Sequence, residues 1–600
     1  MRSLWSLALA ISLPLVAPAP VIASPAAATV PAASAKTSAA QLHTLFAREW
    51  RWRLQQSPML SSSVGERSRE DQLDPVGVKV VEARLPALKA FRAELEEIDI
   101  AALARQDRIN ARIFADQLDN SIGGIEVGEH YLPMTSDSSF YADLGMLARA
   151  HRFDDPVSVA NYLKRLRDIP RYFDAHIVLL KQASKQGRTL PRVVLSGREQ
   201  PLKQVTELED LRESSLFKPL LTLGPAIPAA QAEAFRKEAL EILAEEVRPA
   251  YARLLKYFVE DYVPHARTTL AAEAMPNGKA FYRQQIRTYT TLDLSPQQIH
   301  DTGLAEVARI RADMEAIRRE VGFDGDLEAF FTHLRTAPEF YAKTPEELLM
   351  RASYIAKRID GLLPKYFGKL PRLPYTVAPV PEAIAPYYTT GRYVPPPQGS
   401  TEPGTYWVNT WKLDARPLYV LPALTLHEAV PGHHLQGALA DEQSGQPPFR
   451  RYAYISAYGE GWALYTEWLG QEMGVYTTPY ERFGRLTYEM WRACRLVVDT
   501  GVHAFGWSRA QALDYMKDNT SLSEHEITTE VDRYISWPGQ ALSYKLGELK
   551  IRELRQRAEQ ALGAKFDLRA FHDEVLALGS VPLPVLTDEV VRWIEATRAQ

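Results

Sequence analysis

Two histidines and an adjacent glutamate near residue 430 are the residue types of a catalytic zinc site. Residues 427–436 read His-Glu-Ala-Val-Pro-Gly-His-His-Leu-Gln. A zinc hydrolase needs neutral imidazoles to hold the ion and a carboxylate to take a proton from the bound water, and the short motif H-E-x-x-H places these groups on one helix. We therefore interpret His427 as a ligand and Glu428 as the general base.

The second histidine comes later than an undistorted helix requires. One turn after His427 the chain has Pro431, and histidines follow only at positions 433 and 434. Proline lacks a backbone donor and the next residue is glycine, so we predict a helix bulge that brings His433 to the ion. His434 is the alternative, because seven residues return to the same helix face, although about 10.5 Å further along the axis.

A third zinc ligand is expected from residues 458–467, which read Tyr-Gly-Glu-Gly-Trp-Ala-Leu-Tyr-Thr-Glu. Glu460 lies 27 residues after His433, which leaves room for a loop and a returning helix. We predict Glu460 as the ligand. Glu467, two turns further along the same face, is the alternative ligand or the residue that orients a histidine.

Peptide hydrolysis also needs a donor for the oxyanion of the transition state. His503 is the first candidate, with Asp499 close enough in sequence to orient it. Tyr544 is the second candidate and Tyr534 a further one, although core packing accounts for either tyrosine equally well.

Three other side chains have simpler interpretations. Lys545 and Arg533 are candidates for binding a substrate carboxylate, which would make a carboxypeptidase, but we favour solvation at the surface. The single cysteine, Cys494, excludes an intrachain disulfide, and its apolar helical context predicts burial.

The charge balance and the first residues of the chain limit which classes of protein are possible. The chain has 70 basic and 74 acidic side chains, and this balance argues against a nucleic-acid partner. Residues 1–24 have the pattern of a cleaved signal peptide, with Arg2 before an apolar stretch too short to span a bilayer. We therefore expect a periplasmic or secreted protein without stable membrane insertion. No cysteine lies in this region, so a lipoprotein is not expected.

Apolar spacing predicts a mainly α fold with a small sheet beside the metal-binding helix. Residues 25–40, rich in Ala, Pro and Ser, predict a flexible leader, followed by an N-terminal helical region over 41–275 and a catalytic region over 276–600. Strands are expected at 375–380 and 405–410, separated by a Pro-rich and Gly-rich loop at 395–404. The edge of this sheet could hold an extended peptide.

The motifs together resemble the bacterial family catalogued as domain of unknown function 885. The resemblance runs through residues 427–436, 460–465, 495–503 and 537–547, with a further match at 289–300. Its members look like zincin metallopeptidases, distantly similar to thimet oligopeptidase, angiotensin-converting enzyme and dipeptidyl peptidase III. This similarity implies a helical body divided by a deep cleft, with a histidine pair and a downstream glutamate on zinc.

These observations predict an exported zinc metallopeptidase that acts on short peptides. His427, His433 and Glu460 would hold the metal, Glu428 would be the base, and His503 with Tyr544 would polarise the carbonyl. Two alternatives stay open: a zinc amidase acting on cell-wall or modified peptides, and a binding or scaffold protein without catalysis. The sequence does not indicate the cleavage preference or the oligomeric state.

Overall fold

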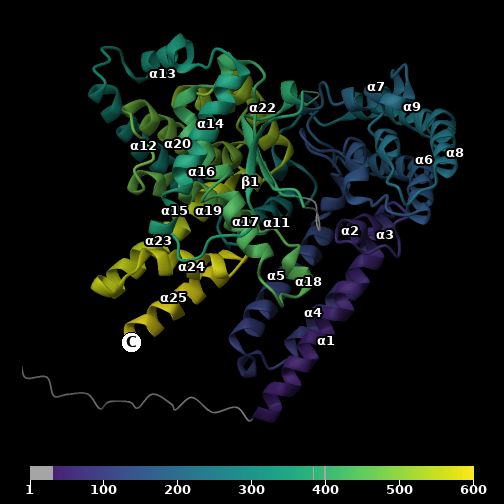
Figure 1. Cartoon of the computed structure of the whole chain (residues 1–600), viewed down its shortest axis with the longest axis horizontal. Helices are drawn as coiled ribbons and strands as arrows, with labels where there is room; N and C mark the ends of the chain where they lie inside the picture. Colours follow the sequence, from purple (N-terminus) through teal and green to yellow (C-terminus); the bar gives the residue numbers. More distant parts are fainter. Residues whose placement is uncertain (1–31, 383, 397–400) are drawn as a thin grey trace, which may run out of the picture.

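The computed structural model describes residues 32–382, 384–396 and 401–600 (Figure 1). The predicted signal peptide and residues 25–31 of the predicted leader lie outside the described residues. The rest of that leader differs from the prediction, because residues 32–40 form the first turns of helix α1 (Ala32–Gln56). Five of these nine residues are alanine, which has the highest helix propensity of all residues.

The first part of the chain forms an arm and a lobe, drawn in purple and blue in Figure 1. After α1, the arm consists of α2 (Pro58–Ser63), α3 (Val78–Glu82), α4 (Leu85–Glu96) and α5 (Arg105–Val127). The lobe consists of α6 (Pro156–Lys185), α7 (Gln200–Thr206), α8 (Ala229–Ile242), α9 (Arg248–Tyr257) and α10 (Val263–His265).

The remaining helices form a larger body, drawn from teal to yellow. Before the sheet come α11 (Gly278–Thr290), α12 (Pro296–Glu320), α13 (Leu327–Thr336), α14 (Pro345–Asp360) and α15 (Leu363–Tyr366). After it come α16 (Leu421–Glu428), α17 (His433–Asp441), α18 (Pro448–Arg451), α19 (Ser456–Glu472), α20 (Pro479–His503), α21 (Arg509–Asn519), α22 (Glu524–Ser536), α23 (Ser543–Leu562), α24 (Leu568–Ala577) and α25 (Leu583–Ala599). The fold is therefore mainly helical, as predicted.

Several helices begin at polar capping residues. The side chains of Ser295, Thr344, Ser508 and Ser523 each accept a hydrogen bond from the backbone N–H of the third helical residue, and so cap α12, α14, α21 and α22. Helices α4 and α5 are separate, since Asp99 caps a 3₁₀ turn between them.

A three-stranded sheet precedes the helix that carries His427. Its order is β1 (Tyr375–Pro379), β3 (Gly404–Val408) and β2 (Gly391–Val394), with β1 parallel and β2 antiparallel to β3. Two of these strands were predicted. The edge strand β2 was missed, because four residues ending before a proline carry too little pattern.

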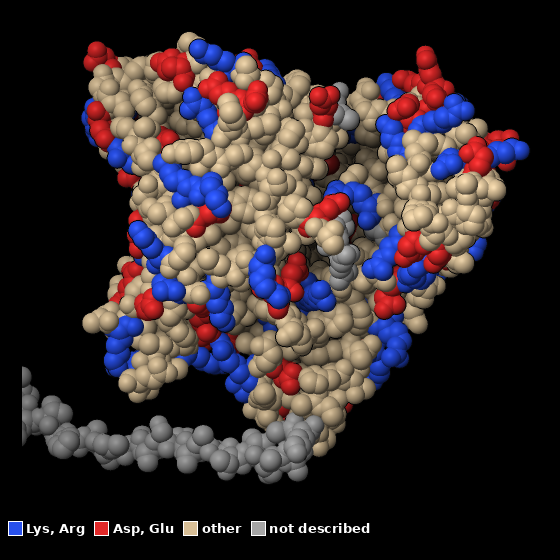
Figure 2. All heavy atoms as spheres, in the orientation of Figure 1, with Lys and Arg blue, Asp and Glu red and all other residues tan. Residues whose placement is uncertain are grey.

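One connected core joins the early and late parts of the chain, with buried residues running from Leu42 to Ile594. Helix α20 lies deep within it: all its residues from Phe483 to His503 are buried. Figure 2 shows that the molecule is hollowed between the lobe and the body, and that basic and acidic side chains are interspersed on this face. No helix of the described residues is both long and apolar enough to span a bilayer.

Candidate metal centre

The histidine segment folds as two helices rather than one bulged helix. Helix α16 ends at Glu428 and α17 begins at His433, with non-helical backbone at Ala429 and Gly432. Pro431 has no N–H to offer the carbonyl of His427 four residues earlier, so the helix cannot continue. The chain turns back so tightly that a Cβ on Gly432 would lie 1.9 Å from that carbonyl oxygen, a contact that only glycine avoids.

Helix α19 holds this turn in place from the other side. The indole Nε1 of Trp462 donates to the carbonyl of Pro431 at 2.8 Å, and the hydroxyl of Thr466 donates to the carbonyl of Leu426 at 2.9 Å. Both bonds satisfy carbonyls near the broken helix end. The same helix carries Glu460, so these two contacts fix the third predicted ligand relative to the histidines.

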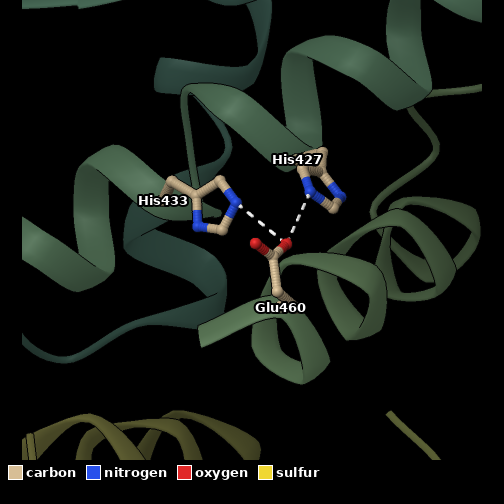
Figure 3. Close-up of side chains that lie close together, drawn as sticks. All are labelled: His427, His433 and Glu460. Atoms are coloured by element: carbon tan, nitrogen blue, oxygen red, sulfur yellow. Dashed lines mark ion pairs between the residues drawn. The ribbon is translucent and has the colours of Figure 1, made fainter. Parts of the chain in front are cut away.

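His427, His433 and Glu460 converge as predicted (Figure 3). Oε2 of Glu460 lies 3.5 Å from Nε2 of His427 and 3.4 Å from Nε2 of His433. Two atoms each about 2.1 Å from a tetrahedral zinc ion would be about 3.4 Å apart. All three ligand atoms lie within 4.8 Å of one another. The two separations to Glu460 match this spacing, and two imidazoles with a carboxylate are a donor set that zinc accepts.

Glu467 orients the first histidine instead of joining the cluster. Its Oε1 accepts a hydrogen bond from Nδ1 of His427 at 2.7 Å, and the carboxylate is 1% exposed. With Nδ1 bound to Glu467, Nε2 is the nitrogen that faces Glu460 and His433 and that a metal ion would bind. This is the arrangement in which a carboxylate fixes the tautomer of a metal-binding histidine.

The electrostatics of the cluster favour a positive charge. Burial lowers the pKa of His427, but hydrogen bonds to Glu460 and Glu467 and the nearby charge of Glu428 outweigh it and raise the pKa to about 10. Burial likewise raises the pKa of Glu460, and the two histidines reverse the effect and hold it well below its usual range. Three carboxylates around two imidazoles thus suit a cation at this position.

His434 faces away from the cluster. Its Nδ1 lies 3.2 Å from the hydroxyl of Tyr393, and its Nε2 lies 3.1 Å from the carbonyl of Leu373. Burial lowers its pKa to about 4, so the ring is neutral at ordinary pH. Of the two histidines that the sequence left open, His433 lies in the cluster.

Glu428 lies between the metal cluster and the edge of the sheet. Its side chain is half-buried, and one carboxylate oxygen accepts the backbone N–H of Tyr393 in β2 at 2.8 Å. The other carboxylate oxygen of Glu428 makes no hydrogen bond with any of the described residues. The sequence could not anticipate this contact, because β2 itself gave no signal.

His503 does not lie at the cluster, so the prediction that it polarises the substrate carbonyl was wrong. It is fully buried, its Nδ1 accepts the N–H of Ala272 at 3.1 Å, and its Nε2 donates to the carbonyl of Tyr534 at 2.8 Å. Burial lowers its pKa to about 3. Both ring nitrogens are engaged with the backbone, which makes His503 a structural link between three segments.

Asp499 does not orient His503 either. Its carboxylate accepts the hydroxyl of Tyr282 at 2.6 Å and the N–H of Gly539 at 3.1 Å. Burial raises the pKa of Asp499 to about 7 even though these bonds oppose the shift.

Replacing Asp499 with Asn should therefore flatten the pH dependence of unfolding. The folded chain holds the Asp499 proton more tightly than the unfolded chain, so stability is lost as pH rises from about 4 to about 7, by up to about 4 kcal/mol. An asparagine cannot ionise and still offers an acceptor to Gly539. Denaturant midpoints of D499N at the two ends of this range should differ less than those of the unmodified chain. An equal difference would contradict the assignment.

The remaining candidates separate by their surroundings. Tyr544 is 7% exposed near the start of α23, and its ring lies under the guanidinium of Arg495 at 4.2 Å. Helix α23 passes so close to α19 that a Cβ on Gly461 would lie 2.5 Å from Gly547. Gly461 directly follows Glu460, and Gly547 lies three residues after Tyr544. Tyr544 therefore belongs to the part of α23 that packs beside Glu460, and it stays a candidate. Tyr534 is buried, with its hydroxyl accepting from Trp491 and Arg495.

Of the two predicted surface cations, Lys545 is not solvated and Arg533 is only partly exposed. Lys545 is fully buried and lies 2.9 Å from each of three carboxylates, those of Glu306, Glu489 and Glu548. Arg533 donates to Gln540 at 3.2 Å and lies over the ring of Trp537. The free charge that a substrate carboxylate would need is therefore absent at Lys545. Cys494 is buried, as predicted.

The resemblance to the family is confirmed over most of the chain. The model of the family described as "Bacterial protein of unknown function (DUF885)" matches residues 58–590. The chain belongs to this family. A search of curated proteins finds no match. Membership in DUF885 establishes common descent, and the family description states no activity.

Two solved structures share the fold of this DUF885 chain. The "putative lipoprotein" of Colwellia psychrerythraea is 28% identical, with a TM-score of 0.86 over 93% of this chain and 99% of the other. A second "putative lipoprotein", of unknown function, from Shewanella oneidensis is 20% identical, with a TM-score of 0.66 over 92% of this chain and 99% of the other. The second likeness shows the fold alone.

Proposed function

We propose that this chain is an exported, zinc-dependent metallopeptidase that hydrolyses short peptides. The observation that carries the proposal is the convergence of His427, His433 and Glu460, with the carboxylate oxygen at the spacing of a tetrahedral zinc site from each histidine. A purely structural zinc site is closed by four protein ligands, whereas a catalytic one has three and keeps a position for water. Among the described residues, the cluster has three.

Glu428 supplies a general base, which a site that only binds a ligand would not need. A zinc ion at the cluster would lower the pKa of a water molecule to about 7 and polarise a carbonyl group. Glu428 follows His427 directly, and Tyr393 holds one of its oxygens. The other oxygen accepts the proton of the attacking water and returns it to the leaving nitrogen. Tyr544 is the proposed donor to the carbonyl oxygen, since His503 is engaged elsewhere.

The sheet edge supports a peptide substrate over a smaller amide. Strand β2 pairs with β3 on one side only, and the N–H of Tyr393 points away from β3 toward Glu428. An extended peptide lying along this edge would place its backbone beside the proposed base. The zincin-like cleft expected from the family resemblance is part of what we propose for this chain.

Export is proposed on two grounds. The first residues have the composition of a signal peptide. The related protein of Colwellia psychrerythraea carries the name "putative lipoprotein". The single cysteine of this chain is Cys494, so the proposed form is a periplasmic or secreted protein.

A digest of a peptide library, read by mass spectrometry, tests the proposed activity. The zinc-loaded chain should cleave short peptides, and the chelated chain should not. Cleavage restricted to one or two residues from an end would identify an exopeptidase. Release of products only from cell-wall fragments would replace the peptidase with the amidase alternative. A metal-loaded chain that cleaves neither would leave a binding protein.

A further inference from the structure

Tyr454 contacts the metal cluster although no sequence motif pointed to it. It lies in the segment between α18 and α19, six residues before Glu460. Its hydroxyl donates to Oε1 of Glu460 at 3.1 Å. The side chain of Tyr454 is 61% exposed. A phenol hydroxyl is protonated at neutral pH, so it acts as a hydrogen-bond donor to this carboxylate.

The two oxygens of Glu460 have different partners. Oε2 faces Nε2 of both His427 and His433, at 3.5 and 3.4 Å, whereas Oε1 is bound to Tyr454. A carboxylate with both oxygens free can bind a metal ion through one of them or through both. The bond from Tyr454 ties up one oxygen and directs the other to the histidines.

Gly459 makes room for the tyrosine. A Cβ built on Gly459 would lie 2.5 Å from the hydroxyl oxygen of Tyr454 and 2.6 Å from the ring carbon that bears it. No real Cβ approaches another atom so closely, so any other residue at position 459 would displace the ring. Position 459 has ordinary helical backbone at the start of α19. Steric room for Tyr454 is therefore the reason for glycine there.

We propose that Tyr454 is a positioning residue of the metal centre, which limits Glu460 to one coordinating oxygen and so keeps a coordination position for water. This inference rests on the proposed function, because it requires a metal ion bound by the three ligands. Without the hydroxyl, Glu460 can bind through both oxygens. The second oxygen would then raise the coordination number from four to five and crowd the position that water needs for the reaction.

Cobalt substitution tests the coordination directly. The full chain is loaded with Co²⁺, whose visible absorption is strong in four-coordinate sites and weak in five-coordinate sites. The unmodified chain should give the strong spectrum and Tyr454→Phe the weaker one. With zinc, Tyr454→Phe should lower kcat by about 10–100-fold with KM nearly unchanged, in line with the loss of other groups that orient metal ligands.

Two further variants separate positioning from folding. Gly459→Ala should reproduce the weaker Co²⁺ spectrum by displacing the ring, and alanine favours a helix more than glycine does, so unfolding of α19 cannot explain the change. Tyr452→Phe is the matched control, because that ring stacks on Trp50 instead. Its spectrum and kcat should equal those of the unmodified chain.

Each result decides a different claim. If the unmodified chain binds Co²⁺ and Tyr454→Phe keeps its spectrum and kcat, the role of Tyr454 is wrong while the metal centre stands. If the unmodified chain binds no Co²⁺, both the role of Tyr454 and the proposed metallopeptidase are overturned.

Discussion

Glu428→Gln should lower kcat for peptide hydrolysis by about 10²–10⁴-fold, the usual contribution of a general base. Glutamine has the same shape, and its carbonyl oxygen can still accept the N–H of Tyr393, so the local structure should be kept. It cannot take a proton from water at neutral pH. Steady-state kinetics on a peptide identified by the library digest measure the effect.

The zinc content of the Glu428→Gln chain is the internal check, because Glu428 is a base and not a ligand in this account. It should remain the same as in the unmodified chain. Glu320→Gln is a matched control: that carboxylate is half-exposed at the end of α12, and its partner is Arg482. Full activity of the Glu428 variant with zinc bound would remove Glu428 from the mechanism.

His433→Ala should weaken zinc binding by more than about 100-fold, while His434→Ala should not. Loss of a group that only orients a ligand already costs about 10–100-fold in affinity, and loss of a ligand costs more. His434 instead contacts the hydroxyl of Tyr393 and the carbonyl of Leu373. Its removal should lower the free energy of unfolding by about 1–3 kcal/mol. Competition with a chromophoric chelator measures the affinity, and urea unfolding measures the stability.

Adjacent histidines make this pair a sharp comparison, because composition and helix context are the same. If His434→Ala lost the metal and His433→Ala kept it, the ligand assignment would be reversed. Equal losses in both variants would indicate general disruption of α17 rather than removal of a ligand.

The convergence of His427, His433 and Glu460 could be predicted because its signal is local. His427 and Glu428 are adjacent, and the Pro-Gly pair after them predicts a break in the helix. Glu460 lies in a separate segment with a helical pattern. The form of the distortion was less predictable. The loss of the hydrogen bond to the His427 carbonyl is a local effect of proline, but the close return of Gly432 depends on α19 packing against the turn.

Residues joined by long-range packing could not be assigned from sequence. His503 comes two residues after Gly501 near a helix end, a pattern shared by active-site and core histidines. Its actual partners, Ala272 and Tyr534, lie 231 and 31 residues away. Tyr454 was missed although its hydrogen bond partner, Glu460, is only six residues away. The position of the ring depends on the space above Gly459, which the sequence alone does not show.

The stoichiometry of zinc in the unmodified chain tests the central claim most directly. The purified full chain is dialysed against buffer with trace zinc, passed over a desalting column, and measured by elemental analysis against protein concentration. We predict one zinc per chain, and none in a variant that lacks both His427 and His433. An unmodified chain without bound zinc would contradict the metal centre and the peptidase built on it.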